Sequence, residues 1–225
     1  TAVVVNSPNS VGDVLIPAFI EHELKKIKII GIKEESFKNN EKIRRIIIPN
    51  ESYLQFISKK SFSCSSIKTL ILSSTVDKLE DGWCSNASHL KTIIISPSNK
   101  HFKYLDEEHQ IIVGKSDINE ENFDTIIFAN RDIKQVTIPN HIKYIKPHAF
   151  ENCKELKSIE FSEDSKLFSI GKKAFLESSI KKLFIPSKVK ELVDGWSNCM
   201  SDLKTVTVSP SNKHFKYLDE EHQII

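Results

Sequence analysis

The chain has 225 residues, of which 39% are hydrophobic and 28% are charged, and its formal net charge at pH 7 is +2. This length can bury a sizeable core, and the composition excludes a disordered chain. The near balance of 32 basic and 30 acidic residues gives no overall argument for a nucleic-acid partner. No apolar run approaches the roughly 18–20 residues of a membrane helix, so no membrane insertion is expected.

An apolar pattern of the form L-x-x-L-x-L recurs along the chain. We assign an early copy to Leu24, Ile27 and Ile29, which precede Phe37. Later copies begin at Ile43, Ile67, Leu90, Ile133, Leu156, Ile180 and Leu203, and these starts are 24, 23, 43, 23, 24 and 23 residues apart. A period of 23 to 24 residues is the signature of leucine-rich repeats, in which each turn of a solenoid contributes one short strand.

The 43-residue interval contains an insertion of about twenty residues. Part of it, Ser96–Ile112, is repeated letter for letter as Ser209–Ile225. The pattern predicts two strands, Phe102–Leu105 and Gln110–Val113, joined by a polar turn. Thr125–Phe128 is predicted to be a further strand that joins the solenoid sheet.

The N-terminal stretch resembles the region that follows this hairpin. Val3–Val5 and Asp13–Pro17 echo Ile111–Val113 and Asp124–Phe128. We therefore expect two four-repeat modules, about 1–112 and 113–225, each bounded by the same hairpin, in a single continuous solenoid domain. The chain would then begin and end inside this hairpin, as a piece of a longer array.

Alternation of apolar and polar residues points every second side chain of a strand inward. The predicted fold is an α/β repeat solenoid. It is a right-handed leucine-rich-repeat solenoid with a concave parallel β-sheet, an irregular or short-helical convex side and inserted β-hairpins. Free cysteines are among the residues most often buried, so we expect Cys64, Cys84, Cys153 and Cys199 to lie in the repeat core.

The repeat unit resembles the BspA-like class of leucine-rich repeats. Ile133–Cys153, IKQVTIPNHIKYIKPHAFENC, carries the resemblance best, and Leu156–Phe175 follows it. The units at Trp83 and Trp196 depart from the family by carrying D-G-W in place of A-F. The resemblance implies a non-enzymatic surface protein, found in bacteria and parasitic protozoa, that adheres to host proteins or cells.

No catalytic motif is present: there is no G-x-S-x-G, Walker loop or dinucleotide-binding fingerprint, and no cofactor is expected. The copied stretch offers a metal interpretation through His101, Asp106, Glu107, Glu108 and His109, repeated as His214, Asp219, Glu220, Glu221 and His222. The alternative is a solvated hairpin turn duplicated with its module. We favour the turn, because the spacing matches neither H-E-x-x-H nor an EF-hand loop.

The candidate protein-binding surface is the concave face, where outward strand positions stack into two ladders. One reads Leu15, Ile47, Ile71, Ile94, Thr137, Glu160, Phe184 and Thr207; the other reads Arg45, Thr69, Thr92, Gln135, Ser158, Lys182 and Thr205. The first half of the first ladder is apolar, and an exposed apolar stripe usually marks an interface. The alternative is that the isoleucines only support strand formation.

These observations predict a binding module in the extracellular part of a surface adhesion or antigen protein. The alternative is an intracellular protein–protein interaction scaffold, which would be cytoplasmic. The expected partner is a host extracellular-matrix or cell-surface protein. Residues 1–10 lack the features of a signal peptide, so a signal or anchor would lie outside this chain. Self-association is expected through an uncapped C-terminal end, where Ile224 and Ile225 finish an incomplete hairpin.

Overall fold

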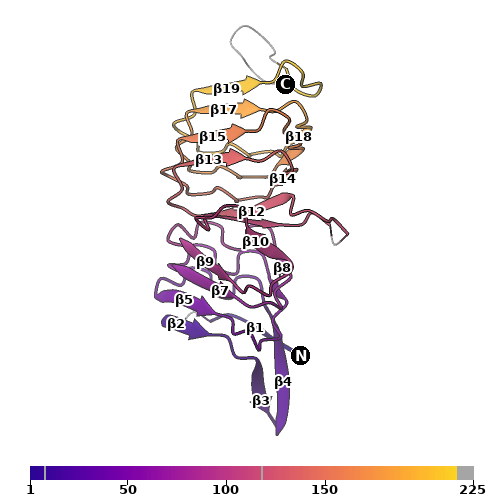
Figure 1. Cartoon of the computed structure of the whole chain (residues 1–225). Coiled ribbons are helices and arrows are strands. Elements are labelled where there is room, and N and C mark those ends of the chain that lie inside the picture. Colours follow the sequence, from indigo (N-terminus) through magenta and orange to yellow (C-terminus); the bar gives the residue numbers. More distant parts are fainter. Residues whose placement is uncertain (8, 118, 217–225) are drawn as a thin grey trace. The chain divides into compact units, whose positions relative to one another are not determined.

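The computed structural model describes residues 1–7, 9–117 and 119–216. The chain divides into two compact units, Thr1–Tyr104 (unit 1) and Leu105–Ile225 (unit 2). Each unit is a parallel β-solenoid in which a typical turn contributes a strand of four or five residues (a long strand) and a strand of two residues (a short strand) (Figure 1). The prediction of a single continuous domain stays a prediction.

Unit 1 contains two sheets. The long-strand sheet runs in the order β2 (Gly12–Leu15), β5 (Ile43–Ile47), β7 (Thr69–Leu72) and β9 (Thr92–Ile95), and all of its pairs are parallel. The short-strand sheet contains β1 (Ala2–Val4), β4 (Lys25–Ile32), β6 (Phe56–Ile57) and β8 (Lys78–Leu79). β3 (Phe19–His22) pairs with β4 in an antiparallel hairpin, and β10 (Phe102–Tyr104) ends the unit.

Unit 2 repeats this plan. Its long strands form two parallel pairs, β13 (Gln135–Ile138) with β15 (Ser158–Phe161), and β17 (Lys182–Ile185) with β19 (Thr205–Val208). Its short-strand sheet contains β11 (Ile111–Gly114), β12 (Thr125–Ala129), β14 (Tyr144–Ile145), β16 (Ser169–Ile170) and β18 (Glu191–Leu192). β11 and β12 are antiparallel, and the remaining pairs in this series are parallel.

The core of each unit lies between its long strands and its short strands, and aromatic rings stack along it. In unit 1 the ring centroids of Phe37 and Phe62 are 5.3 Å apart, and Trp83 meets Phe62 edge-on at 6.1 Å. In unit 2, Phe150 and Phe175 stack at 5.4 Å. Trp83 therefore occupies the inward position that a phenylalanine fills in the turn before it, and the D-G-W departure keeps the repeat architecture.

The predicted first repeat was wrong. Leu24 is fully exposed at the tip of the β3–β4 hairpin. The inward strand of that turn is β2, because Val14 pairs with Ile46 and Ile16 is buried at 3% exposure. The repeat thus starts at Val11, and the β3–β4 hairpin is an insertion between its long strand and Phe37.

The prediction of short helices on the convex side was also wrong, since the described residues contain no helix. Phe37 N donates to Ser61 O at 2.8 Å, and Phe62 N donates to Trp83 O at 2.9 Å. These backbone groups bond to the next repeat, so they are not available for bonds within a helix. Tight turns with left-handed residues fill the space instead, as at Asn39 (φ 57°).

Two cysteines are buried as predicted, Cys84 and Cys153, but Cys64 and Cys199 are exposed. Both exposed residues have positive φ, 55° for Cys64 and 56° for Cys199. They stand at the left-handed positions of these turns, where the side chain leaves the core. The prediction of four core cysteines therefore failed at the turns.

Candidate binding face

The outward side chains of the long strands in unit 1 form an apolar row of Leu15, Ile47, Ile71 and Ile94. Strand pairing places Leu15 opposite Ile47, Ile47 opposite Ile71, and Ile71 opposite Ile94. Leu15 is 58% exposed and Ile94 is 46% exposed, while the two residues between them are half-buried. The predicted register is thus confirmed in unit 1, and it leaves four aliphatic side chains side by side at the surface.

A polar row runs beside the apolar row on the same strands. Arg45 pairs with Thr69, and Thr69 pairs with Thr92. The Arg45 guanidinium Nη1 lies 3.4 Å from Asp13 Oδ2, and both side chains are about half-exposed. An exposed ion pair of this kind contributes at most about 1 kcal/mol, so Arg45 can exchange Asp13 for a partner's carboxylate at small cost.

Asp13 is a surface residue that the sequence reasoning missed. It belongs to the polar row because β2, and not the Leu24 segment, is the first long strand. The sequence signal for Asp13 is the match of Val11-x-x-Val14-x-Ile16-Pro17 to Ile43-x-x-Ile46-x-Ile48-Pro49, which aligns Asp13 with Arg45.

In unit 2 the corresponding positions are predominantly polar. Gln135 pairs with Ser158 and Thr137 with Glu160; Lys182 pairs with Thr205 and Phe184 with Thr207. Phe184, at 43% exposure, is the apolar member of these ladders. The apolar row is therefore a feature of unit 1, and unit 2 presents hydroxyl, amide and charged groups.

The copied stretch has a structural role where the structure describes it. Both oxygens of the Asp106 carboxylate accept backbone hydrogen bonds at 2.8 Å, from Gln110 N and Ile111 N. Within the described residues no group of three or more His, Cys, Asp or Glu side chains could hold a metal ion. Four members of the second copy, Asp219, Glu220, Glu221 and His222, lie outside the described residues.

One of the two thiols of unit 2, that of Cys153, is made unreactive by burial. Complete burial of Cys153 raises its pKa to about 11, although the nearby Arg131 guanidinium acts in the opposite direction. At neutral pH this thiol is protonated, so it cannot act as a nucleophile.

Among the described residues there is no helix that is long and apolar enough to cross a lipid bilayer.

The repeated strands of each unit define it as the solenoid of a repeat protein. The sequence matches the BspA type leucine-rich repeat region in six copies, over residues 5–105 and 121–219. The chain belongs to this family. No protein of curated function matches its sequence.

Three solved structures share the fold. The pneumococcal vaccine antigen PcpA superposes with a TM-score of 0.68 at 18% identity, over 88% of this chain and 51% of that one. A leucine-rich cell surface protein of Faecalibacterium prausnitzii A2-165 gives 0.54 at 16% identity, over 91% and 61%. A leucine-rich repeat protein of Eubacterium ventriosum ATCC 27560 gives 0.56 at 16% identity, over 87% and 59%. The chain thus spans between half and about three-fifths of these proteins.

Proposed function

We propose that the chain is a non-enzymatic protein-binding module of a surface or secreted protein, and that it binds host proteins or cells. The observation that carries this proposal is the apolar row of unit 1. An outward strand position that serves only the fold is usually polar or mixed, whereas contiguous exposed apolar groups usually mark an interface. Two of the similar structures are described as a vaccine antigen and a cell surface protein, which supports the surface setting.

The apolar row and the polar row would make different contributions to binding. Burial of an aliphatic side chain contributes about 1.5–3 kcal/mol, so the apolar row supplies affinity. The neighbouring polar row, with Arg45, Thr69 and Thr92, supplies hydrogen bonds that fix the partner's orientation. In unit 2, Gln135, Thr137, Lys182 and Phe184 would form a second and more polar contact surface.

The test is to replace Ile94 by Lys and to measure binding of the full chain to immobilised extracellular-matrix proteins and to intact host cells. Ile94 is 46% exposed, so the substitution leaves the core intact. We expect binding to fall at least tenfold, because a charge replaces one of the most exposed apolar contacts of the row. Ile71→Lys should act in the same direction.

Val193→Lys is the matched control, since Val193 is 40% exposed and lies outside the long strands. It should bind like the parent chain. Equal binding by a folded Ile94→Lys variant would refute the role of the apolar row.

An intracellular interaction scaffold is the second candidate, and one observation favours it. The four cysteines are free, which is usual for proteins kept in a reducing compartment. Antibody labelling of intact and permeabilised cells separates the two functions. Labelling of intact cells supports the surface module, and labelling only after permeabilisation supports the scaffold.

A further inference from the structure

A column of basic residues runs along each unit at the point where the long strands begin. The second position of each L-x-x-L-x-L repeat is basic in all seven copies that start at Ile43 or later: Arg44, Lys68, Lys91, Lys134, Lys157, Lys181 and Lys204. All seven side chains are exposed. We call Arg44, Lys68 and Lys91 the basic column of unit 1, and the last four the basic column of unit 2.

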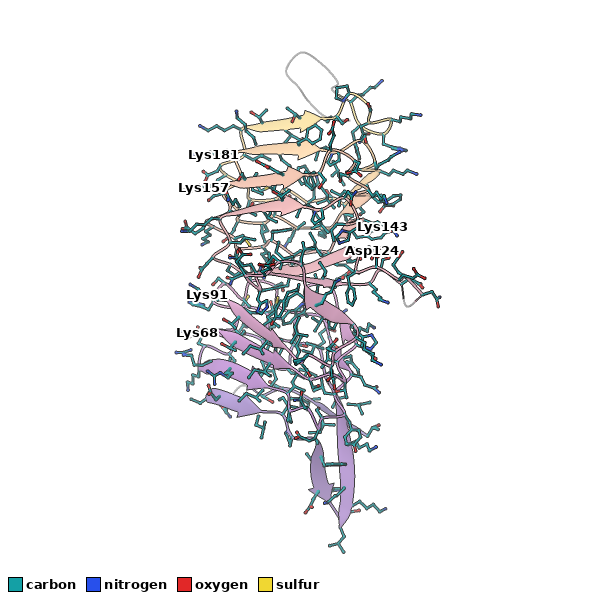
Figure 2. All side chains as sticks on the ribbon, viewed as in Figure 1. Lys68, Lys91, Asp124, Lys143, Lys157 and Lys181 are labelled. Carbon is teal, nitrogen blue, oxygen red and sulfur yellow. The ribbon has the colours of Figure 1, made fainter. Side chains whose placement is uncertain are left out.

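The backbone places successive members of a column directly next to each other. In unit 1, Lys68 N donates to Arg44 O at 2.8 Å, and Lys91 N donates to Lys68 O at 3.1 Å. In unit 2, Lys157 N donates to Lys134 O at 3.0 Å, and Lys204 N donates to Lys181 O at 2.9 Å. β15 and β17 lie in contact and join the two pairs of unit 2. Figure 2 shows Lys157 and Lys181 at the same end of these strands, and Lys68 and Lys91 likewise on β7 and β9.

This arrangement opposes folding. Neighbouring strands are about 4.8 Å apart, which is less than the screening length of about 8 Å at physiological salt. Like charges on adjacent strands destabilise a sheet. A charge repeated at every turn therefore does not stabilise the solenoid.

The chain does not neutralise the basic column of unit 2. Carboxylates stand two residues before three of its members, as Asp132, Glu155 and Asp202. Within the described part of the chain, no ion pair joins any of the four lysines to an acidic side chain. Other lysines of unit 2 do have such partners: Lys143 Nζ lies 2.6 Å from Glu120 Oε2, and Lys154 Nζ lies 3.5 Å from Glu177 Oε2.

From these observations we infer that the basic column of unit 2, Lys134, Lys157, Lys181 and Lys204, binds an extended acidic polysaccharide that lies across the strands. A linear polymer with a regularly repeated anionic group can meet one ammonium group per turn. Because none of the carboxylates that the structure describes pairs with these lysines, the anionic groups of the polymer can pair with them and so compensate the repulsion among them. The basic column of unit 1 would bind the same polymer with three charges.

The neighbouring side chains favour a polysaccharide over a nucleic acid. The residue after each lysine is Gln135, Ser158, Lys182 or Thr205, so hydroxyl, amide and ammonium groups adjoin the column. Such groups hydrogen-bond the hydroxyls of a sugar chain. Proteins that bind single-stranded nucleic acid place aromatic rings beside a basic groove for base stacking. None of the four following residues is aromatic.

The experiment compares two variants of the full chain with equal charge. The column variant carries Lys134→Gln, Lys157→Gln, Lys181→Gln and Lys204→Gln. The control variant carries Lys166→Gln, Lys172→Gln, Lys188→Gln and Lys213→Gln, four exposed lysines of unit 2 that lie outside the column. The probe is a heparin oligosaccharide, and its affinity is measured from low to physiological salt, with far-UV circular dichroism to confirm folding.

We expect the parent chain and the control variant to bind the oligosaccharide within threefold of each other. Each lysine near an anionic surface contributes roughly a fivefold factor, so the column variant should lose at least a hundredfold. The slope of log affinity against log salt should also become shallower by roughly three, because fewer counterions are released.

Three outcomes would overturn the inference: no binding by the parent chain at low salt, equal losses in the two variants, or equal binding of single-stranded DNA or polyglutamate at the same column. The first outcome would show that the chain has no binding site for the polysaccharide. The second assigns the effect to overall charge, and the third assigns the column to another class of polyanion. This result leaves the protein-binding proposal untouched, since that proposal is carried by the apolar row of unit 1, which neither variant changes.

Discussion

Asparagine side chains connect successive turns of both units. Asn99 Nδ2 donates to Ser73 O at 2.9 Å and Val76 O at 3.0 Å, and its Oδ1 accepts from His101 N and Phe102 N. Asn212 makes the corresponding four bonds, with Pro186 O and Val189 O as acceptors. The copied stretch therefore preserves a structural amide, which closes the turn after the long strand and ties it to the previous repeat.

Replacement of Asn99 by Ala should lower the free energy of unfolding by about 2–4 kcal/mol, because two carbonyls and two amides lose their partner. Asn212→Ala should act in the same direction. The measurement is urea denaturation followed by circular dichroism.

Ser98→Ala is the control for the Asn99 variant. Ser98 is exposed, and its replacement should change stability by less than about 0.5 kcal/mol. If Asn99→Ala is as mild as the control, the amide does not connect the turns.

At the scale of an element, the segment between β11 and β12 is held by one buried carboxylate. Asp124 Oδ1 accepts from Ser116 N, and Oδ2 accepts from Ser116 Oγ, both at 2.8 Å. Lys143 Nζ lies 3.3 Å from Asp124 Oδ2 and 2.6 Å from Glu120 Oε2; Figure 2 labels Asp124 and Lys143 close together. One side chain thus holds both ends of the segment against β14.

The pKa of Asp124 is lowered from its ordinary value of 3.8. Burial alone would raise it, but the hydrogen bonds from Ser116, Thr125 and Lys143 outweigh burial. Because the folded pKa lies below the unfolded one, this carboxylate contributes stability above pH 3.8. The contribution disappears as the pH falls further, through the folded pKa.

Asp124→Asn should therefore destabilise the chain at pH 7 by about 3 kcal/mol and much less at pH 2.5. Urea midpoints of the parent and the variant, measured across this pH range, should converge as the pH falls. Asp202→Asn changes an exposed carboxylate of the same unit and should leave the midpoints unchanged. A constant difference between parent and Asp124→Asn at every pH would show that the charge is not responsible.

At the scale of the whole molecule, each turn contacts only its neighbours, so stability is a sum of local and nearest-neighbour contributions. Each unit contains one of the two tryptophans, Trp83 in unit 1 and Trp196 in unit 2. We propose that the two units unfold as one continuous solenoid.

The Trp83→Phe variant tests this, because Trp196 becomes its single fluorophore. Trp83 is 3% exposed, so the substitution weakens the core of unit 1. We expect Trp196 fluorescence, which reports on unit 2, to show a lowered urea midpoint that coincides with the midpoint by circular dichroism. A Trp196 midpoint that equals the parent value would mean that the units unfold independently.

Much of the fold follows from the repeat alone. The inward positions could be predicted because a 23–24-residue period with L-x-x-L-x-L allows one stacking register, and Ile46, Leu70 and Ile93 are all buried accordingly. The same register fixed which residues would form the apolar row. The basic columns can also be found from the aligned repeats, since the seven copies from Ile43 onward all carry a basic residue at the same position.

Tertiary structure decided what lies outside this pattern. Asp13-Val14-Leu15-Ile16 and Asp124-Thr125-Ile126-Ile127 look alike in sequence. The first forms part of a long strand against β5, and the second leads into the short-strand sheet against β14. The alternation of apolar and polar residues predicts which side chains of a strand point inward. It does not predict which sheet the strand joins, because that depends on which neighbouring strand has a free hydrogen-bonding edge. For the same reason Leu24 could match the repeat and still lie at an exposed hairpin tip.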